Sequence, residues 1–582
     1  MLGLLLLFLI NYMYGFTIFR IFFKKIHLLE KIILPNLFGF ATTPFVFLLL
    51  YFIIGFDSAI YVLPILAIIL FAFSFKIKQK CYNTPIEKKS FLILILIILW
   101  LMIMLPIPNV LNMPHFGNVG EISYHISVAN DIKNFKSAPH INPFLYGTKI
   151  IYPWVYHTLL ALGSIYSGIP VVYIIHIFKP YFWLFFFFGN FIIGYNYFKK
   201  VWLGILFMLI LSLFLFSNFF VPTTMDYSLC IVTLYFYIFM NYIKNRSTRL
   251  AFLAGIICSS IIYLHGVIFV FIALFHYSIF IYLLFNRKLK QAIVLLFPLV
   301  FILPYFLTMK NVVTSMFLFV PFSGIVYNYL SMFNILLLTL IFGIRKALKN
   351  RDDVQIIFLI SLIVLFIFVN TFIILGGYGI DYIIIFMIFP ITFISLYYIK
   401  DARHALKIIF TIIFIVLFLL PNINYLNLYS VQNGYKNEYN AMQWIRKNTD
   451  IENYVLVSPF SYWVSLAERR TIIIDPQIQT FYQQSPTVHF IDVVAMYSSP
   501  SKELYEKYNI SYVIQCNKEF EFAKMYNFSL YDFSNSHAFK TVFSDGNCNI
   551  FKLIDLRELS NSTTRFSKEE LATSYYSRWW ML

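Results

Sequence analysis

Residues 2–25, LGLLLLFLINYMYGFTIFRIFFKK, decide the class of fold. The apolar run of about 20 residues is long enough to cross the roughly 30 Å hydrocarbon core of a bilayer as a helix. Its positive charge, on Arg20, Lys24 and Lys25, follows the run, whereas a secretory signal peptide carries its charge before the apolar stretch. The segment therefore predicts a retained transmembrane helix that begins outside, because basic residues mark the cytoplasmic end of a span.

Apolar runs of similar length recur through the first three quarters of the 582 residues. The chain is 60% hydrophobic and only 12% charged, which is about half the charged share of an average soluble domain. A cytosolic enzyme is excluded. We predict a polytopic α-helical membrane protein with about 14 transmembrane helices and a C-terminal extracytoplasmic α/β domain. The first four spans are expected near 2–23, 32–56, 58–75 and 91–107, and the last near 408–426.

The formal charge of +18 belongs to the membrane part of the chain. From Asn427 onward there are 15 Lys and Arg against 16 Asp and Glu, which leaves 29 basic and 10 acidic side chains before it. Short basic loops usually lie on the cytoplasmic side, so nucleic acid is not needed to explain the charge. Every basic break falls on that side if 108–150 lies outside and one helix crosses between about 170 and 198. The stretch 250–285 is then a pair of helices with an outer turn near His265.

The expected topology divides the chain into five regions. The segment 151–167 is helical in pattern, but as a full crossing it would reverse every later loop, so we place it at the outer interface. The regions are N-terminal helices (1–107), a first large extracytoplasmic loop with this interfacial helix (108–169), a helical body (170–426), an extracytoplasmic α/β domain (427–557) and a polar tail (558–582).

Within the C-terminal domain the pattern predicts a helix over 437–448. Short strands are expected at 454–457, 471–474, 511–515, 540–543 and 549–553. Cys516 and Cys548 each adjoin an expected strand. An oxidising exterior allows a disulfide between them, and two unpaired buried thiols are the alternative.

Chemistry in the membrane part is expected at the outward carboxylates, since charges near a bilayer are costly and tend to be functional or paired. Glu121 lies in the longest outer loop, and on a helix His125 would share its face. A shielded carboxylate beside an imidazole suits removal of a proton from a hydroxyl. The plain alternative is a helix N-terminal acid stabilised by the helix dipole and paired with His125. The outward carboxylates are Asp57, Glu121, Asp131, Asp226 and Asp381.

A phosphate group at the outer interface would need cationic or hydrogen-bonding partners. Each candidate also has an ordinary explanation, such as snorkelling from a helix end, a tight turn, a solvated loop or, for Asp226, a helix cap. The candidates for binding a substrate are Lys149, His157, Asp226, His265, Lys310, Asp381, Arg469 and Arg470.

The first outer loop and the helix after it contain Glu121, His125, Pro143, Tyr152-Pro153 and His157 in that order. In this order and spacing the chain resembles the GT-C superfamily of integral-membrane glycosyltransferases, and it is similar to the dolichyl-phosphate-mannose-type mannosyltransferases. The resemblance extends through the helical body and into the outer α/β domain. There, residues 444–449 and 507–513 look like short sequence motifs that recur in such proteins.

The resemblance implies transfer of a sugar from a polyprenyl-phosphate donor to an acceptor hydroxyl on the extracytoplasmic face, with inversion at the anomeric carbon. Glu121 takes the place of the first-loop base, which is more often Asp in the family, and Asp131 is the local substitute. The partners implied are the lipid-linked donor, a glycan, lipid or protein acceptor, and membrane lipids. Trp579-Trp580 lacks the following Asp of the oligosaccharyltransferase signature, so that subgroup is disfavoured; no cofactor is required, and a divalent cation is left open.

Two other functions stay open. A transporter or flippase for a lipid-linked or small polar solute would also need many spans, but it predicts ionisable residues near mid-membrane and often repeated halves. A non-catalytic relative could keep the architecture as a scaffold. The richness in Phe, Ile, Tyr, Asn and Lys favours an AT-rich genome, and we expect a prokaryotic cell membrane as the location.

Overall fold

The computed structural model divides into two compact units. Unit 1 comprises Met1–Ile107, Pro153–Ile169 and Tyr173–Leu428, and unit 2 comprises Pro108–Tyr152, Pro170–Val172 and Tyr429–Leu582. The structure describes residues 2–81, 88–104, 120–139, 142–143, 145–148, 154–214, 224–303, 317–318, 339–371, 373–374, 379–400, 436–474 and 487–561.

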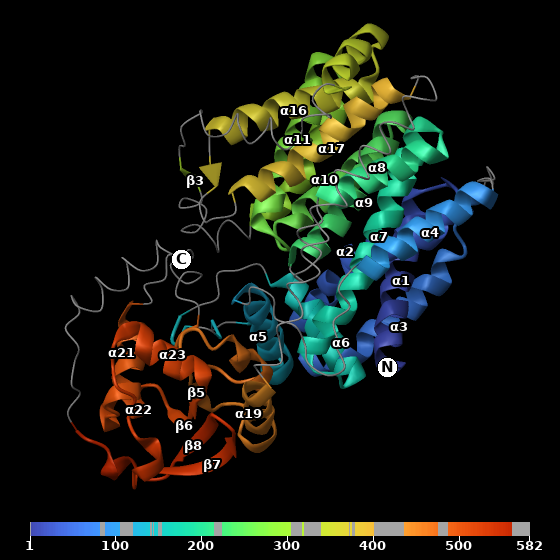
Figure 1. Ribbon diagram of the computed structural model, residues 1–582. Coiled ribbons are helices and arrows are strands. Elements are labelled where there is room, and N and C mark those ends of the chain that lie inside the picture. The colour runs from blue at the N-terminus through green and yellow to red at the C-terminus, as the bar shows by residue number, and fades with distance from the viewer. Residues whose placement is uncertain are drawn as a thin grey trace. The chain divides into compact units, whose positions relative to one another are not determined.

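Unit 1 is a bundle of apolar helices (Figure 1). Its helices are α1 (Leu2–Phe22), α2 (Leu28–Ile54), α3 (Phe56–Ser74), α4 (Lys88–Met104), α6 (Val155–Ser167), α7 (Val171–Phe198), α8 (Val201–Phe214), α9 (Thr224–Asn245), α10 (Thr248–Ile261), α11 (Gly266–Phe285), α12 (Leu289–Leu296), the 3-10 helix η2 (Phe297–Ile302), α16 (Asp353–Thr371) and α17 (Gly379–Ile399). Two-residue strands pair β1 (Lys25–Ile26) with β2 (Lys80–Cys81) and β3 (Phe317–Leu318) with β4 (Ile373–Ile374).

Six of the described helices are long and apolar enough to cross a membrane. The expected spans of the N-terminal region agree with α1 to α4 within a few residues, and the stretch 250–285 forms two helices, α10 and α11, as expected. The total of about 14 spans includes the expected span 408–426, which lies outside the described residues. Many side chains on α3 are exposed and apolar, such as Ile65 and Ile68, as a lipid-facing helix requires.

Helix α1 packs against α2 at the closest approach that backbones allow. A methyl group on Gly15 would lie 1.7 Å from the carbonyl oxygen of Pro35, and one on Gly39 would lie 1.9 Å from that of Asn11. Inside lipid the hydrophobic effect does not drive helices together, so their association depends on van der Waals packing. Small residues at a crossing allow the two backbones to approach closely enough for that packing. This pair of glycines therefore fixes how the first two helices cross.

The basic breaks of unit 1 gather at one end of the bundle. Lys25 pairs with Lys80 in the β1–β2 ladder, Lys200 Nζ donates to the Lys400 carbonyl at 2.9 Å, and Arg246 forms an ion pair with Asp353. Each contact joins two breaks that are distant in sequence. This grouping is the arrangement that alternating spans with basic loops on one side require.

Unit 2 is an α/β domain built on a four-stranded sheet of order β5-β6-β8-β7. Strand β5 is parallel to β6, while β8 is antiparallel to both β6 and β7. The elements are α5 (Gly120–Phe135), α19 (Lys436–Asn448), β5 (Tyr454–Leu456), the 3-10 helix η5 (Tyr462–Ala467), α21 (Thr487–Ser498), α22 (Lys502–Lys507), β6 (Ile510–Gln515), α23 (Asn517–Tyr526), β7 (Phe539–Asp545), β8 (Cys548–Leu553) and the 3-10 helices η6 (Phe533–Asn535) and η7 (Leu556–Glu558). Figure 1 shows α5 beside α19 and the sheet.

The sequence predicted the helix and four of the five strands of this domain, but the expected strand at 471–474 is wrong. Ile473 forms only an isolated bridge to Leu145, and the Tyr146 amide donates to the Ile472 carbonyl at 2.9 Å. Both partners come from the first loop, so the segment joins that loop to the domain and does not extend the sheet.

Cys516 and Cys548 form a disulfide, which resolves the two alternatives left by the sequence. The bond links the end of β6 to the start of β8, and these strands are already antiparallel neighbours. Disulfides persist in oxidising compartments and are rare in the cytosol.

We expect reduction of this disulfide to destabilise unit 2. The cystine closes a loop with a sequence separation of 32 residues, and the chain-entropy model gives about 3–4 kcal/mol for a loop of that length. Cys548→Ser should therefore lower the thermal unfolding transition of the purified chain, and a reductant should lower the wild-type transition by a similar amount. The reductant should leave Cys548→Ser unchanged, and a variant that still responds to it would contradict the assignment.

Candidate functional site

Helix α5 carries three of the residues singled out in the sequence. Glu121 lies in its first turn and His125 lies one turn later, so the two positions share a face. His125 is fully buried. Asp131 is ten residues beyond Glu121, and at 3.6 residues per turn it lies about 80° around the helix from it. The three positions therefore do not form one cluster.

Asp131 is engaged by the C-terminal part of unit 2. Arg470 donates from Nε and Nη2 to Asp131 Oδ2 at 3.3 and 3.1 Å, and its guanidinium lies 4.0 Å from the centroid of the Phe135 ring. Burial raises the pKa of the Asp131 carboxyl to about 6, and the Arg470 guanidinium opposes that shift. A carboxylate held in this way orients α5 on the domain.

A second ionic network ties the same helix to the domain. Lys133 Nζ lies 2.7 Å from Glu468 Oε2, and Arg446 Nε lies 2.8 Å from Glu468 Oε1. Asn130 Nδ2 also donates to the Ser465 carbonyl at 3.1 Å. The end of α5 that follows His125 is thus held by several polar contacts.

The two arginines expected to bind phosphate both have structural partners. Arg469 donates from Nε to Thr449 Oγ1 at 2.9 Å and from Nη1 to the carbonyls of Ala467 and Glu468, each at 3.1 Å. Arg470 is held by Asp131. These contacts supply each guanidinium with acceptors from its own unit.

Unit 1 contains a separate buried polar cluster. Asp226 lies in the first turn of α9 and is 3% exposed, and Tyr156 and His157 are buried on α6. The Asp226 carboxylate interacts electrostatically with Tyr156 and with the ammonium group of Lys179 on α7. The structure therefore brings Asp226 close to α6, which carries His157.

Lys179 is the residue that the sequence analysis missed. It is 4% exposed, and no hydrogen-bond partner of its Nζ is found among the described residues. A buried ammonium without a hydrogen bond is costly and is usually functional in a membrane protein. The signal was present in the sequence, because Lys179 interrupts the 28-residue apolar helix α7 just before Pro180.

The remaining predicted site residues are dispersed or lie elsewhere. His265 is the N-cap residue of α11 and is buried, and Asp381 lies in the first turn of α17. Lys149 and Lys310 lie outside the described residues. Across the described ranges, no group of three or more His, Cys, Asp or Glu side chains could hold a metal ion.

Comparison with known proteins gives matches among solved structures alone. No protein-family model matches the sequence, and no curated protein matches it. The structure of ArnT from Cupriavidus metallidurans bound to undecaprenyl phosphate matches with a TM-score of 0.52 at 10% identity, over 80% of this chain and 98% of that one. The apo oligosaccharyltransferase of Archaeoglobus fulgidus matches with a TM-score of 0.47 at 13% identity, over 75% and 70% of the two chains. AglB from the same organism, in complex with an inhibitory peptide and a dolichol-phosphate, matches with a TM-score of 0.44 at 12% identity, over 74% and 70%.

The likeness to ArnT establishes the class of fold. The chain is a polytopic α-helical integral membrane protein with a small C-terminal α/β domain, and its fold is similar to that of ArnT. The fold resemblance expected from the first loop is confirmed.

We expect Arg470→Met to destabilise unit 2 in a pH-dependent way. The pKa of Asp131 is raised in the folded protein, so its protonated form favours folding and this contribution fades as the pH rises through about 6. Without Arg470 the charged carboxylate is uncompensated, which costs roughly 3 kcal/mol. The thermal transition should therefore fall much more at pH 8 than at pH 5.

The double variant Asp131→Asn/Arg470→Met is the control for this measurement. It removes the charge together with its partner, so most of the pH-dependent loss should disappear. An equal loss at both pH values in the single variant would refute a role for the Asp131 charge.

Proposed function

We propose that the chain transfers a sugar from a polyprenyl-phosphate donor to an acceptor hydroxyl on the extracytoplasmic face, with inversion at the anomeric carbon. Glu121 is the proposed general base, assisted by His125. The fold is that of ArnT, whose structure contains undecaprenyl phosphate. The observation that carries the proposal is the buried ammonium of Lys179 near Asp226.

Lys179 has the chemistry that a lipid-linked phosphate needs. It lies eight residues after the start of α7, roughly 12 Å along that helix. Its ammonium has three donors and no hydrogen-bond partner among the described residues. A charge-assisted hydrogen bond to phosphate would repay the cost of burying this group. Asp226 and His157 are proposed ligands of the sugar.

The choice of Glu121 as base is supported by the position of Asp131. Asp131 is held by Arg470, and the ion pair is mostly buried, so its carboxylate has a partner that a base would have to give up. Glu121 shares its helix face with His125 instead. The N–H of an imidazole next to a carboxylate can donate a hydrogen bond to it and so orient it.

The proposed step balances without a redox partner. The acceptor hydroxyl gives its proton to the Glu121 carboxylate as its oxygen bonds to the anomeric carbon. The bond from that carbon to the phosphate oxygen breaks, and its electron pair leaves with the phosphate. The products are the glycosylated acceptor and polyprenyl phosphate, whose added negative charge Lys179 stabilises.

The extracytoplasmic placement of unit 2 is part of the proposal. The Cys516–Cys548 disulfide supports it, because disulfides persist in oxidising compartments. The gathering of basic breaks at one end of unit 1 is also what this sidedness requires. Lys149, His265, Lys310, Asp381, Arg469 and Arg470 stay predicted substrate ligands.

A second function is favoured by the same buried lysine. Ionisable residues within spans are typical of transporters, so Lys179 and Asp226 also fit a flippase for a lipid-linked solute. The two functions separate on one assay, since a flippase moves a labelled lipid phosphate across vesicles without forming a glycosidic bond. A scaffold would do neither.

We expect Glu121→Gln to lower the rate of sugar transfer at least 100-fold, because general-base catalysis typically contributes 10²–10⁴-fold. The measurement is transfer from defined polyprenyl-phosphate sugars by purified protein in lipid vesicles. Asp131→Asn is the matched control and should keep most of the activity. A selective loss in Asp131→Asn would move the base to that residue, and full activity in both variants would exclude the mechanism.

We expect Lys179→Met to raise the KM for the lipid-linked donor at least tenfold and to lower kcat as well. A hydrogen bond to a charged group contributes about 1.5–3 kcal/mol, and the leaving phosphate gains charge in the transition state. Lys290→Met, an exposed lysine with the same change of charge, should leave both parameters unchanged. Unaltered kinetics in Lys179→Met would remove this residue from the donor site.

A further inference from the structure

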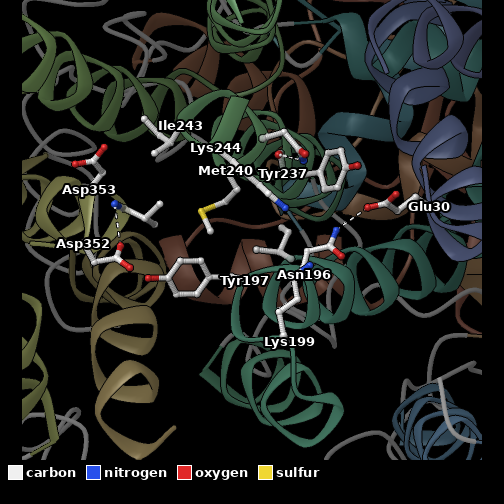
Figure 2. Close-up of a pocket in the computed structure, with 13 residues that line it drawn as sticks. Glu30, Asn196, Tyr197, Lys199, Tyr237, Met240, Ile243, Lys244, Asp352 and Asp353 are labelled. Carbon is white, nitrogen blue, oxygen red and sulfur yellow. Dashed lines mark hydrogen bonds between the residues drawn. The ribbon is translucent and has the colours of Figure 1, made fainter. Parts of the chain in front are cut away.

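A pocket lies at the basic end of unit 1, within the bundle. It has a volume of about 430 Å³ and is formed by the start of α2, the end of α7, the end of α9 and the start of α16. Figure 2 shows its charged residues on opposite walls, with Lys199 and Lys244 directed into it. Its volume is in the range of small-molecule sites, about 300–1,000 Å³.

The carboxylates that line this pocket already have structural partners. Glu30 accepts from the His27 amide and from Asn196 Nδ2, each at 2.6 Å. Asp352 Oδ1 caps α16 by accepting from the amides of Val354 and Gln355, each at 3.1 Å. Each of these two acids therefore stabilises a helix end.

Asp353 also has structural partners. It forms an ion pair with Arg246 and accepts a hydrogen bond from the Tyr282 hydroxyl. All three acids of the pocket are thus engaged by neighbouring groups of unit 1.

The two lysines of the pocket are not engaged. Within the described part of the chain, neither Lys199 nor Lys244 makes a side-chain hydrogen bond or an ion pair. Burial and the nearby Lys244 ammonium lower the pKa of Lys199, while Glu30 opposes the shift. The neighbouring Lys200 differs, because its Nζ donates to the Lys400 carbonyl at 2.9 Å. The two ammonium groups therefore keep hydrogen-bond donors that no described residue fills, although Glu30 lies close enough to attract Lys199.

The backbone at Lys199 ends α7. Lys199 follows α7 with a φ of 58°, in the left-handed region that favours Gly or Asn after a helix. A residue with a Cβ pays roughly 1 kcal/mol or more there. The same conformation ends α5 at Lys136 and α9 at Arg246, so it belongs to the end of the helix and is not a mark of the pocket.

We infer that this pocket binds a phosphate group, with Lys199 and Lys244 as its ligands. A phosphate oxygen accepts hydrogen bonds from several ammonium donors at once, and such charge-assisted hydrogen bonds are strong. The wall formed by Ile193, Met240 and Ile243 would contact an apolar or glycerol moiety next to that phosphate. The phosphate belongs either to the headgroup of an anionic phospholipid or to a soluble phosphate ester. The site is distinct from the proposed donor site, because it lies among the basic breaks.

The test uses the full chain, purified in a non-ionic detergent and freed of lipid. It is titrated with phosphatidylglycerol in mixed micelles and, separately, with inorganic phosphate at constant ionic strength. Binding is measured by native mass spectrometry for the lipid and by calorimetry for phosphate. We expect saturable binding of at least one ligand by the wild type, weakened at least tenfold in Lys199→Gln/Lys244→Gln.

The control variant is Arg249→Gln/Lys290→Gln, which changes the charge equally at exposed positions outside the pocket. It should bind within twofold of the wild type. Binding of phosphatidylglycerol alone identifies the lipid as the source, and binding of inorganic phosphate identifies a soluble ester. The inference is overturned if neither ligand binds saturably, or if the control loses as much affinity as the pocket variant. The single variants Lys199→Gln and Lys244→Gln, each of which should weaken binding, decide the matter if the double variant fails to fold.

Discussion

The cost of placing a charge in hydrocarbon is the constraint on which this molecule depends. The apolar helices of unit 1 satisfy their own backbone groups, and nearly all charged side chains are confined to helix ends and loops. Where a charge remains inside a helix, as at Lys179, the bundle buries it near Asp226. Polar chemistry is therefore restricted to a few positions, and each of them requires an explanation.

The sequence predicted the helices of unit 1 well because their signal is local. The length and hydropathy of an apolar run, followed by lysines, define a span without knowledge of its neighbours. The same holds for four of the five strands of unit 2. The failed strand, 471–474, has its partner at Leu145 in the first loop, and no local pattern shows a contact over more than 300 residues.

The sequence named candidate residues for the site, but it did not show which of them lie together in the fold. Glu121, His125 and Asp131 are close in sequence, but helix geometry separates Asp131 from the other two, and its partner Arg470 lies 339 residues away. Lys179 was missed for a different reason, because a single lysine barely changes the hydropathy of a 28-residue helix. Its position inside an apolar helix was visible in the sequence, but its burial and its unfilled hydrogen-bonding capacity among the described residues show why it is unusual.

The crossing of α1 and α2 at Gly15 and Gly39 has a consequence for biogenesis. The two helices are consecutive and are joined by a short basic turn, so they can dock as a hairpin as soon as both have left the translocon. A bulky substitution at either glycine would delay this docking and expose a nascent chain with an unpaired first helix. Quality-control proteases would then degrade a polypeptide in which the candidate functional residues, all later in the sequence, were unchanged.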